Sequence, residues 1–121
     1  MSSVVHDWAN VAESEPLPGF VGKVLHSDTM SFALWTIRAG SVLPEHSHVH
    51  EQVVHMIEGE FELVVDGEAK RLRPGMVAAI PSLARHSARA LTDCRILDVF
   101  QPVREDYRNG LNAGVIGGGR R

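Results

Sequence analysis

The feature that most constrains this chain is a succession of short apolar segments separated by turn residues. From Gly19 to Gln101 there are about nine such segments, at a spacing of roughly 8–12 residues. Two of the turns have sequences typical of tight connections between strands. Asp66-Gly67 is a strong hairpin signal, and Gly59 suits a tight turn because glycine adopts a positive φ easily. No helical period joins the segments. The pattern is typical of an all-β sandwich or barrel.

The expected strands divide the chain into three parts. They cover residues 19–26, 30–38, 41–46, 52–57, 61–65, 68–72, 76–80, 85–90 and 95–101. Residues 1–18 are expected to form an N-terminal arm with a short helical turn around 7–12. Residues 19–104 would form one barrel domain, which suits a chain of 121 residues, and residues 105–121 a flexible C-terminal tail.

Composition restricts the classes of partner and compartment. The net charge of −3 does not support nucleic-acid binding, which usually leaves a basic footprint. No apolar run approaches the roughly 20 residues needed to span a bilayer. The single cysteine, Cys94, cannot form an internal disulfide, and the N-terminus does not resemble a secretory signal. We therefore expect a cytoplasmic protein that binds neither nucleic acid nor membrane.

The histidines are concentrated in one place. The chain has 7 histidines and 1 tyrosine, and four of the histidines lie within residues 46–55, in and after the string HSHVHEQ. On a straight strand His46, His48, His50 and Gln52 would point to one face. Imidazole nitrogens and amide oxygens are both ligands for first-row divalent ions. A further histidine, His86, follows a second turn-rich segment, so the sequence predicts a site for one divalent metal ion.

These two segments resemble the two motifs of the cupin family. In the first motif Gly40, His46, His48 and Gly59 match, and Gln52 stands where the family has Glu. In the second Gly75, Pro81 and His86 match, whereas Leu83 replaces a Gly and Ala90 an Asn. The resemblance implies a cupin jelly-roll barrel, also called a double-stranded β-helix.

The same resemblance implies which residues hold the metal. The ligands would be His46, His48, Gln52 and His86, and Zn, Ni, Fe, Mn and Co are all compatible with such a shell. Because Gln52 is neutral, the ion would keep more Lewis acidity and bind less tightly than with Glu. Gln52 could alternatively be a structural amide beside a three-histidine site. His50 is expected beside the ligands or at the rim, His55 in packing or solvent, and His6 and His26 on the surface.

The segment 97–107, LDVFQPVREDY, carries a narrower resemblance, to the KdgF-like cupins that linearise unsaturated uronates in pectin and alginate breakdown. Asp98, Phe100 and Arg104 match the spacing of that family's Asp, Phe and Arg. The resemblance implies an enzyme that opens a 4,5-unsaturated uronate to the linear keto acid. In this hypothesis Asp98 moves the proton, Arg104 grips the carboxylate of the sugar acid, and Phe100 packs on the ring.

Simple chemistry is compatible with that hypothesis but leaves alternatives open. An inward-facing Asp on an apolar strand is unfavourable without a role or a partner, and burial would raise its pKa. Asp98 could instead bind a backbone amide or Arg95, and Arg104 could be a solvated charge beside Glu105 and Asp106. Trp35 is expected to pack in the core or at an interface.

Two further functions remain open at this level. One is an iron-dependent dioxygenase, because a three-histidine site also suits Fe(II). The other is a non-catalytic module that binds a metal or a sugar acid. In each case a homodimer is expected, paired through an N-terminal strand or a sheet edge, since an exposed edge needs covering.

Overall fold

The computed structural model describes residues 3–108, and the elements within that range are almost all β. Ten strands are found there: β1 Ser14–Leu17, β2 Phe20–His26, β3 Ser31–Ile37, β4 Val42–His46, β5 Glu51–Glu58, β6 Phe61–Val65, β7 Glu68–Leu72, β8 Val77–Ile80, β9 His86–Ala90 and β10 Cys94–Gln101. Two short 3-10 helices accompany them, η1 (Trp8–Asn10) and η2 (Glu105–Tyr107).

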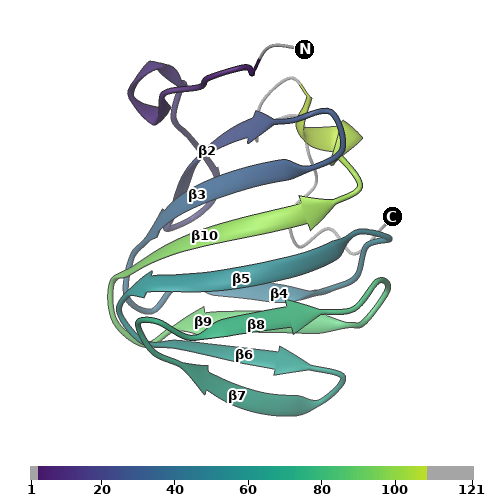
Figure 1. Cartoon of the computed structure of the whole chain (residues 1–121). Coiled ribbons are helices and arrows are strands. Elements are labelled where there is room, and N and C mark those ends of the chain that lie inside the picture. Colours follow the sequence, from purple (N-terminus) through teal and green to yellow (C-terminus); the bar gives the residue numbers. More distant parts are fainter. Residues whose placement is uncertain (1–2, 109–121) are drawn as a thin grey trace.

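The strands form two antiparallel sheets in jelly-roll order (Figure 1). The larger sheet has the order β1-β2-β3-β10-β5-β8, and the smaller has the order β4-β9-β6-β7. Strands remote in sequence are therefore neighbours: β10 lies between β3 and β5, and β9 lies between β4 and β6. The predicted all-β jelly roll is confirmed, and this crossing brings residues 46, 86, 98 and 104 within reach of one another.

The core lies between the two sheets. Along β3 and β10 every second residue is buried and the intervening ones are half-buried or exposed, which is the two-residue period of a strand with one face inward. The buried apolar side chains come from both sheets and include Phe20, Trp35, Ile37, Val54, Phe61, Leu63, Ile80 and Ile96.

Local turn chemistry explains how the strands are joined. Asp66 and Gly67 both have positive φ (48° and 82°), as the predicted hairpin between β6 and β7 requires. Gly59 has φ 88°, and a Cβ there would collide with the backbone oxygen of Asp93. At Leu83, where the family pattern has a glycine, the backbone keeps φ 68°, so the left-handed conformation survives without the residue that favours it.

The predicted boundaries of the arm and the tail need correction. Residues 14–17 of the arm form β1, which pairs with β2, and the expected helical turn is the short helix η1, capped by the Asp7 side chain. Within the expected tail, Tyr107 on η2 is only 3% exposed. The first segment is held by its pairing with the larger sheet, and the second by its buried aromatic ring. Residues 109–121 of the expected tail lie outside the described range.

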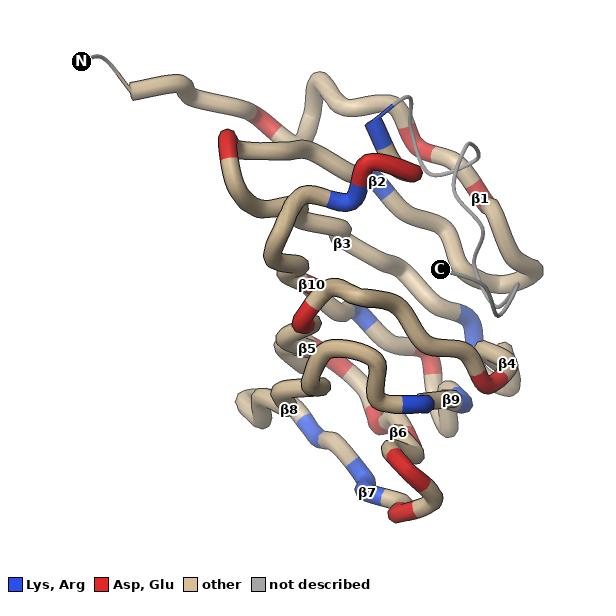
Figure 2. The backbone as a smooth tube through the Cα atoms, turned by 90° about the vertical axis from the view of Figure 1, so that its right-hand side faces the viewer, with Lys and Arg blue, Asp and Glu red and all other residues tan. Residues whose placement is uncertain are grey.

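Charged residues of both signs lie on β6, β7 and β9 of the smaller sheet (Figure 2). Ion pairs there join Arg71 to Glu60 and Arg89 to Glu62, at 3.6 and 3.5 Å between nitrogen and oxygen. Exposed pairs of this kind add little to stability, so they chiefly mark a face turned to solvent. No helix among residues 3–108 is long and apolar enough to cross a membrane.

Candidate metal centre and active site

Three of the predicted ligands converge in the structure. His46 ends β4 and lies directly opposite His86, the first residue of β9, while His48 stands on the loop between β4 and β5. Their ligand nitrogens all lie within 4.8 Å of one another, so the three histidines could hold a metal ion. The chain turns between His46 and Glu51, so the cluster does not arise from one straight strand.

Each of the three rings is oriented by a backbone carbonyl two residues away. Nδ1 of His46 donates to the carbonyl oxygen of Pro44 at 2.9 Å, and Nδ1 of His48 donates to that of His50 at 3.0 Å. In the same way, Nδ1 of His86 donates to the carbonyl oxygen of Ala84 at 2.9 Å. A carbonyl oxygen only accepts, so the hydrogen of each neutral ring must be on Nδ1. With Nδ1 engaged in this way, Nε2 is the nitrogen of each ring that could bind a metal, as in histidines that hold metals. His86 Nε2 is buried without a hydrogen-bond partner.

Electrostatics keeps at least two of these rings neutral. Burial lowers the pKa of His48 to about 3, and the positive charge of Arg104 acts in the same direction. Burial is also the main cause that lowers the pKa of His86. At neutral pH both imidazoles therefore have the uncharged form that binds a cation.

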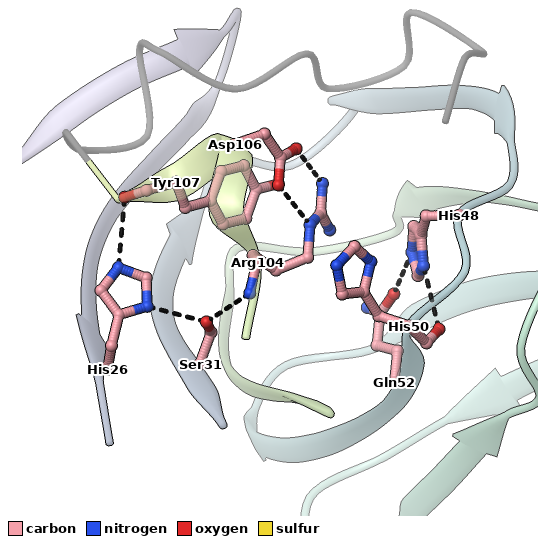
Figure 3. A network of polar contacts seen from close by, with 8 residues as sticks. All are labelled: His26, Ser31, His48, His50, Gln52, Arg104, Asp106 and Tyr107. Atoms are coloured by element: carbon pink, nitrogen blue, oxygen red, sulfur yellow. Dashed lines mark hydrogen bonds and ion pairs between the residues drawn. The ribbon is translucent and has the colours of Figure 1, made fainter. Parts of the chain in front are cut away.

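Gln52 lies beside the cluster, on the inward face of β5. It is 7% exposed, and its Oε1 is 3.1 Å from His48 Nε2 (Figure 3). His50 is also buried, with its ring 5.5 Å from that of His48 between centroids, and its carbonyl orients His48. His55 faces the outside of β5 and is exposed.

Asp98 occupies the middle of β10, with its side chain inward. One carboxylate oxygen, Oδ2, accepts a hydrogen bond from the Trp35 indole at 3.1 Å, while Oδ1 is buried without a hydrogen-bond partner. Burial raises the pKa of Asp98 to about 6, against the smaller opposing effects of Gln52, Trp35 and Arg104. Arg95 lies on the other face of β10 and donates to Thr36, so it is not the partner of Asp98.

Arg104 is buried, and the interpretation of it as a solvated charge is wrong. Only 2% of the residue is exposed. Nε and Nη2 donate to the two carboxylate oxygens of Asp106 at 2.9 and 2.7 Å. The guanidinium carbon lies 4.1 Å from the centroid of the Tyr107 ring and 4.8 Å from that of Phe100. Burial is the largest single effect and opposes the charge, but the hydrogen bonds to Asp106 and the electrostatic effects of Tyr107, Asp106 and Asp98 together raise the pKa of Arg104.

A polar network that sequence reasoning missed holds the backbone at Arg104 (Figure 3). The Arg104 amide donates to the Ser31 hydroxyl at 2.8 Å, and the same oxygen is 2.7 Å from His26 Nδ1. His26 Nε2 lies 3.2 Å from the carbonyl oxygen of Tyr107. The expectation that His26 is an ordinary surface residue is therefore wrong. No local motif marks His26, because its partners come from β3 and η2.

These groups share one cavity of about 50 Å³ inside the barrel. Its polar lining consists of His46, His48, Gln52, His86, Asp98 and Arg104, and the rest is apolar, including Phe20, Ile37, Phe61, Leu63 and Phe100. The sequence-predicted residues are thus brought together at the polar end of a largely apolar cavity. Such an arrangement can bind a cation beside a carboxyl group of raised pKa and a guanidinium group held in a fixed orientation.

Comparisons with known proteins agree with this geometry. A family model described as "Cupin domain" matches residues 33–100. The pectin degradation protein KdgF of Dickeya dadantii is 28% identical over 83 residues, which cover 67% of this chain and 76% of that protein. An L-ectoine synthase of Hahella chejuensis is 34% identical over 86 residues, which cover 68% of this chain but only 65% of the synthase's own length. The structure of KdgF from Halomonas sp. superposes with a TM-score of 0.80 at 28% identity, over 87% of this chain and 98% of that one.

Proposed function

This chain belongs to the cupin family, and its predicted resemblance to KdgF-like cupins is confirmed, so we propose that it opens 4,5-unsaturated uronates to the linear keto acid with the help of a bound divalent metal ion. One observation carries the proposal. The three-histidine cluster, Asp98 and Arg104 line the same cavity. A ligand set, a proton carrier and a carboxylate-binding fork would then act on one small molecule.

The donor set fits a metal ion. In the orientation described, Gln52 Oε1 and His48 Nε2 both present lone pairs at 3.1 Å, a repulsive contact unless a cation lies between them. We therefore assign His46, His48 and His86 as ligands and Gln52 as the fourth. A bound ion would supply Lewis acidity toward the oxygens of the substrate.

The reaction is an isomerisation, so protons are moved but not consumed. Opening the ring removes a proton from the anomeric hydroxyl as the bond between C1 and the ring oxygen breaks. The ring oxygen becomes that of an enol at C5, and forming the ketone there adds a proton to C4. Asp98, whose pKa of about 6 lies near neutrality, is suited to both transfers. Its buried oxygen Oδ1 has no hydrogen-bond partner, although the nearby Gln52 side chain opposes the rise in the pKa of this carboxyl.

Arg104 and Phe100 would bind the sugar acid. The guanidinium is a fork that matches a carboxylate, and Phe100 offers an aromatic ring 3% exposed in the same wall. Because the cavity measures only about 50 Å³, a six-carbon sugar acid would extend beyond it.

The variant Asp98→Asn tests the proposal. It keeps the size of the side chain but removes the proton carrier, and we expect turnover of unsaturated mono-uronate to fall by about 100-fold or more. Metal content, measured by elemental analysis, should be unchanged. Asp28→Asn, in the exposed turn after β2, is the matched control. Wild-type turnover by a metal-loaded Asp98→Asn protein would remove the catalytic role of Asp98.

The comparisons favour one second candidate. The match to L-ectoine synthase is stronger in identity, at 34%, although it spans 65% of that protein. Formation of ectoine by the metal-loaded protein, without acceleration of uronate opening, would favour it. The iron-dependent dioxygenase is separated from both by its requirement for oxygen.

A further inference from the structure

We propose that Asp106 is a positioning residue, which holds one edge of the Arg104 guanidinium so that the other edge faces the three-histidine cluster and receives the carboxylate of the substrate. This inference rests on the proposed function for the identity of that carboxylate. The orientation of Arg104 by Asp106 stands on contacts alone.

The contact between the two side chains is bidentate and shielded. Nε and Nη2 of Arg104 donate to separate oxygens of Asp106, at 2.9 and 2.7 Å, and the two side chains are 3% and 18% exposed. Paired, charge-assisted hydrogen bonds of this kind fix a guanidinium in direction as well as in place. A pair so little exposed is also screened far less by solvent than the surface pairs of the smaller sheet.

The donors that Asp106 leaves free point to a second ligand. A guanidinium has five N–H groups, and the contact with Asp106 uses one on Nε and one on Nη2. Of the three that remain, one on Nη1 and the second on Nη2 are parallel and form another fork. Arg104 lines the cavity, whereas Asp106 does not, so the carboxylate of Asp106 approaches from outside the cavity wall. Asp106 therefore supports Arg104 from behind and leaves the cavity side open.

Packing and backbone contacts complete the support. The rings of Tyr107 and Phe100 lie against the guanidinium, and the two rings meet edge to face with centroids 6.0 Å apart. The backbone is fixed at the same place by Ser31, which accepts from the Arg104 amide (Figure 3). With both ends of the side chain held, the free fork has one direction, which is what a site for a single carboxylate requires.

The test compares two carboxylates of the same short helix. Asp106→Asn removes the bidentate partner of Arg104, and Glu105→Gln removes an exposed carboxylate that pairs with Arg108. We expect Asp106→Asn to lower kcat/KM for unsaturated uronate by about 10–100-fold, mainly through a higher KM. Glu105→Gln should stay within about twofold of wild type, and Asp106→Glu should recover part of the loss. Metal content and thermal midpoint are measured for every variant.

A lower KM in Asp106→Asn would overturn the inference, because it would mean that Asp106 competes with the substrate for Arg104. Unchanged kinetics would overturn it as well. A second readout does not depend on turnover and uses NMR spectra of protein with ¹⁵N-labelled arginine. The Nε–H signal of Arg104 is assigned by its loss in Arg104→Lys. This hydrogen should exchange slowly with water in wild type and in Glu105→Gln, but rapidly in Asp106→Asn. If wild type does not open uronates, the proposed function fails, and this signal still decides whether Asp106 holds Arg104. Its persistence in Asp106→Asn would refute the positioning role.

Discussion

The buried carboxyl of Asp98 should make the stability of the metal-free protein depend on pH in a defined direction. Its pKa rises from an ordinary 3.8 to about 6 because burial penalises the charged form. The folded state therefore holds the proton more tightly than the unfolded state. The stabilisation from protonated Asp98 is complete below about pH 4 and is lost as the pH rises through 6.

The magnitude follows from the size of the shift. About two pKa units correspond to about 3 kcal/mol, of which about 2 kcal/mol falls between pH 4.5 and pH 7.5. Asp98→Asn is neutral throughout, so its free energy of unfolding minus that of wild type should increase by about 2 kcal/mol over this interval. His48 and His86, whose lowered pKa values act in the opposite direction, contribute equally to both proteins and cancel.

The assay is urea unfolding followed by tryptophan fluorescence, after exhaustive treatment with chelator because a nearby cation would lower the pKa of Asp98. Asp28→Asn, which removes an exposed carboxyl, should show no comparable trend. A difference between Asp98→Asn and wild type that stays flat with pH would refute the raised pKa. A difference that shrinks as the pH rises would show that the fold stabilises the carboxylate anion.

Two further predictions concern stability. Leu83→Gly should raise the free energy of unfolding by about 1 kcal/mol in the same urea assay. Leu83 has φ 68° and is 59% exposed, so the substitution relieves backbone strain with little loss of packing, and a destabilised variant would contradict this. Ser31→Ala should lower the free energy of unfolding by about 1–3 kcal/mol, because the buried Arg104 amide loses its hydrogen-bond acceptor. Ser87→Ala on β9 is the control. Equal stability of the two variants would show that the contact at Ser31 contributes nothing.

Much of the fold was predictable because its signals are local. The nine expected strands correspond to β2 through β10, since alternation and turn residues act within a few positions, as at Asp66-Gly67. The strand β1 was missed because its four residues include Pro16 and lack a clear apolar alternation. Its pairing with β2 is decided by the tertiary fold, which no local pattern reports.

The meeting of the three histidines was expected from the resemblance to the cupin motifs, whereas the surroundings of Asp98 and Arg104 could not be predicted. The motif residues His46, His48 and His86 meet in the structure as expected. Trp35 donates to Asp98 from a position 63 residues away in sequence, and His26 reaches Tyr107 across 81 residues. The sequence places Asp106 two residues after Arg104, but the charged residues around this pair indicated an exposed segment. Only the packing of η2 against Phe100 shows that the pair is buried.

Ring opening is tested most directly by an assay of the metal-loaded protein on unsaturated mono-uronate. The loss of ultraviolet absorbance above the spontaneous rate is followed with and without oxygen, and with and without chelator. If the chain opens uronate rings as proposed, the acceleration does not depend on oxygen and disappears when the metal is removed. No acceleration with any of Zn, Ni, Fe, Mn or Co, or acceleration only in the presence of oxygen, would contradict the proposal that this cupin opens uronate rings.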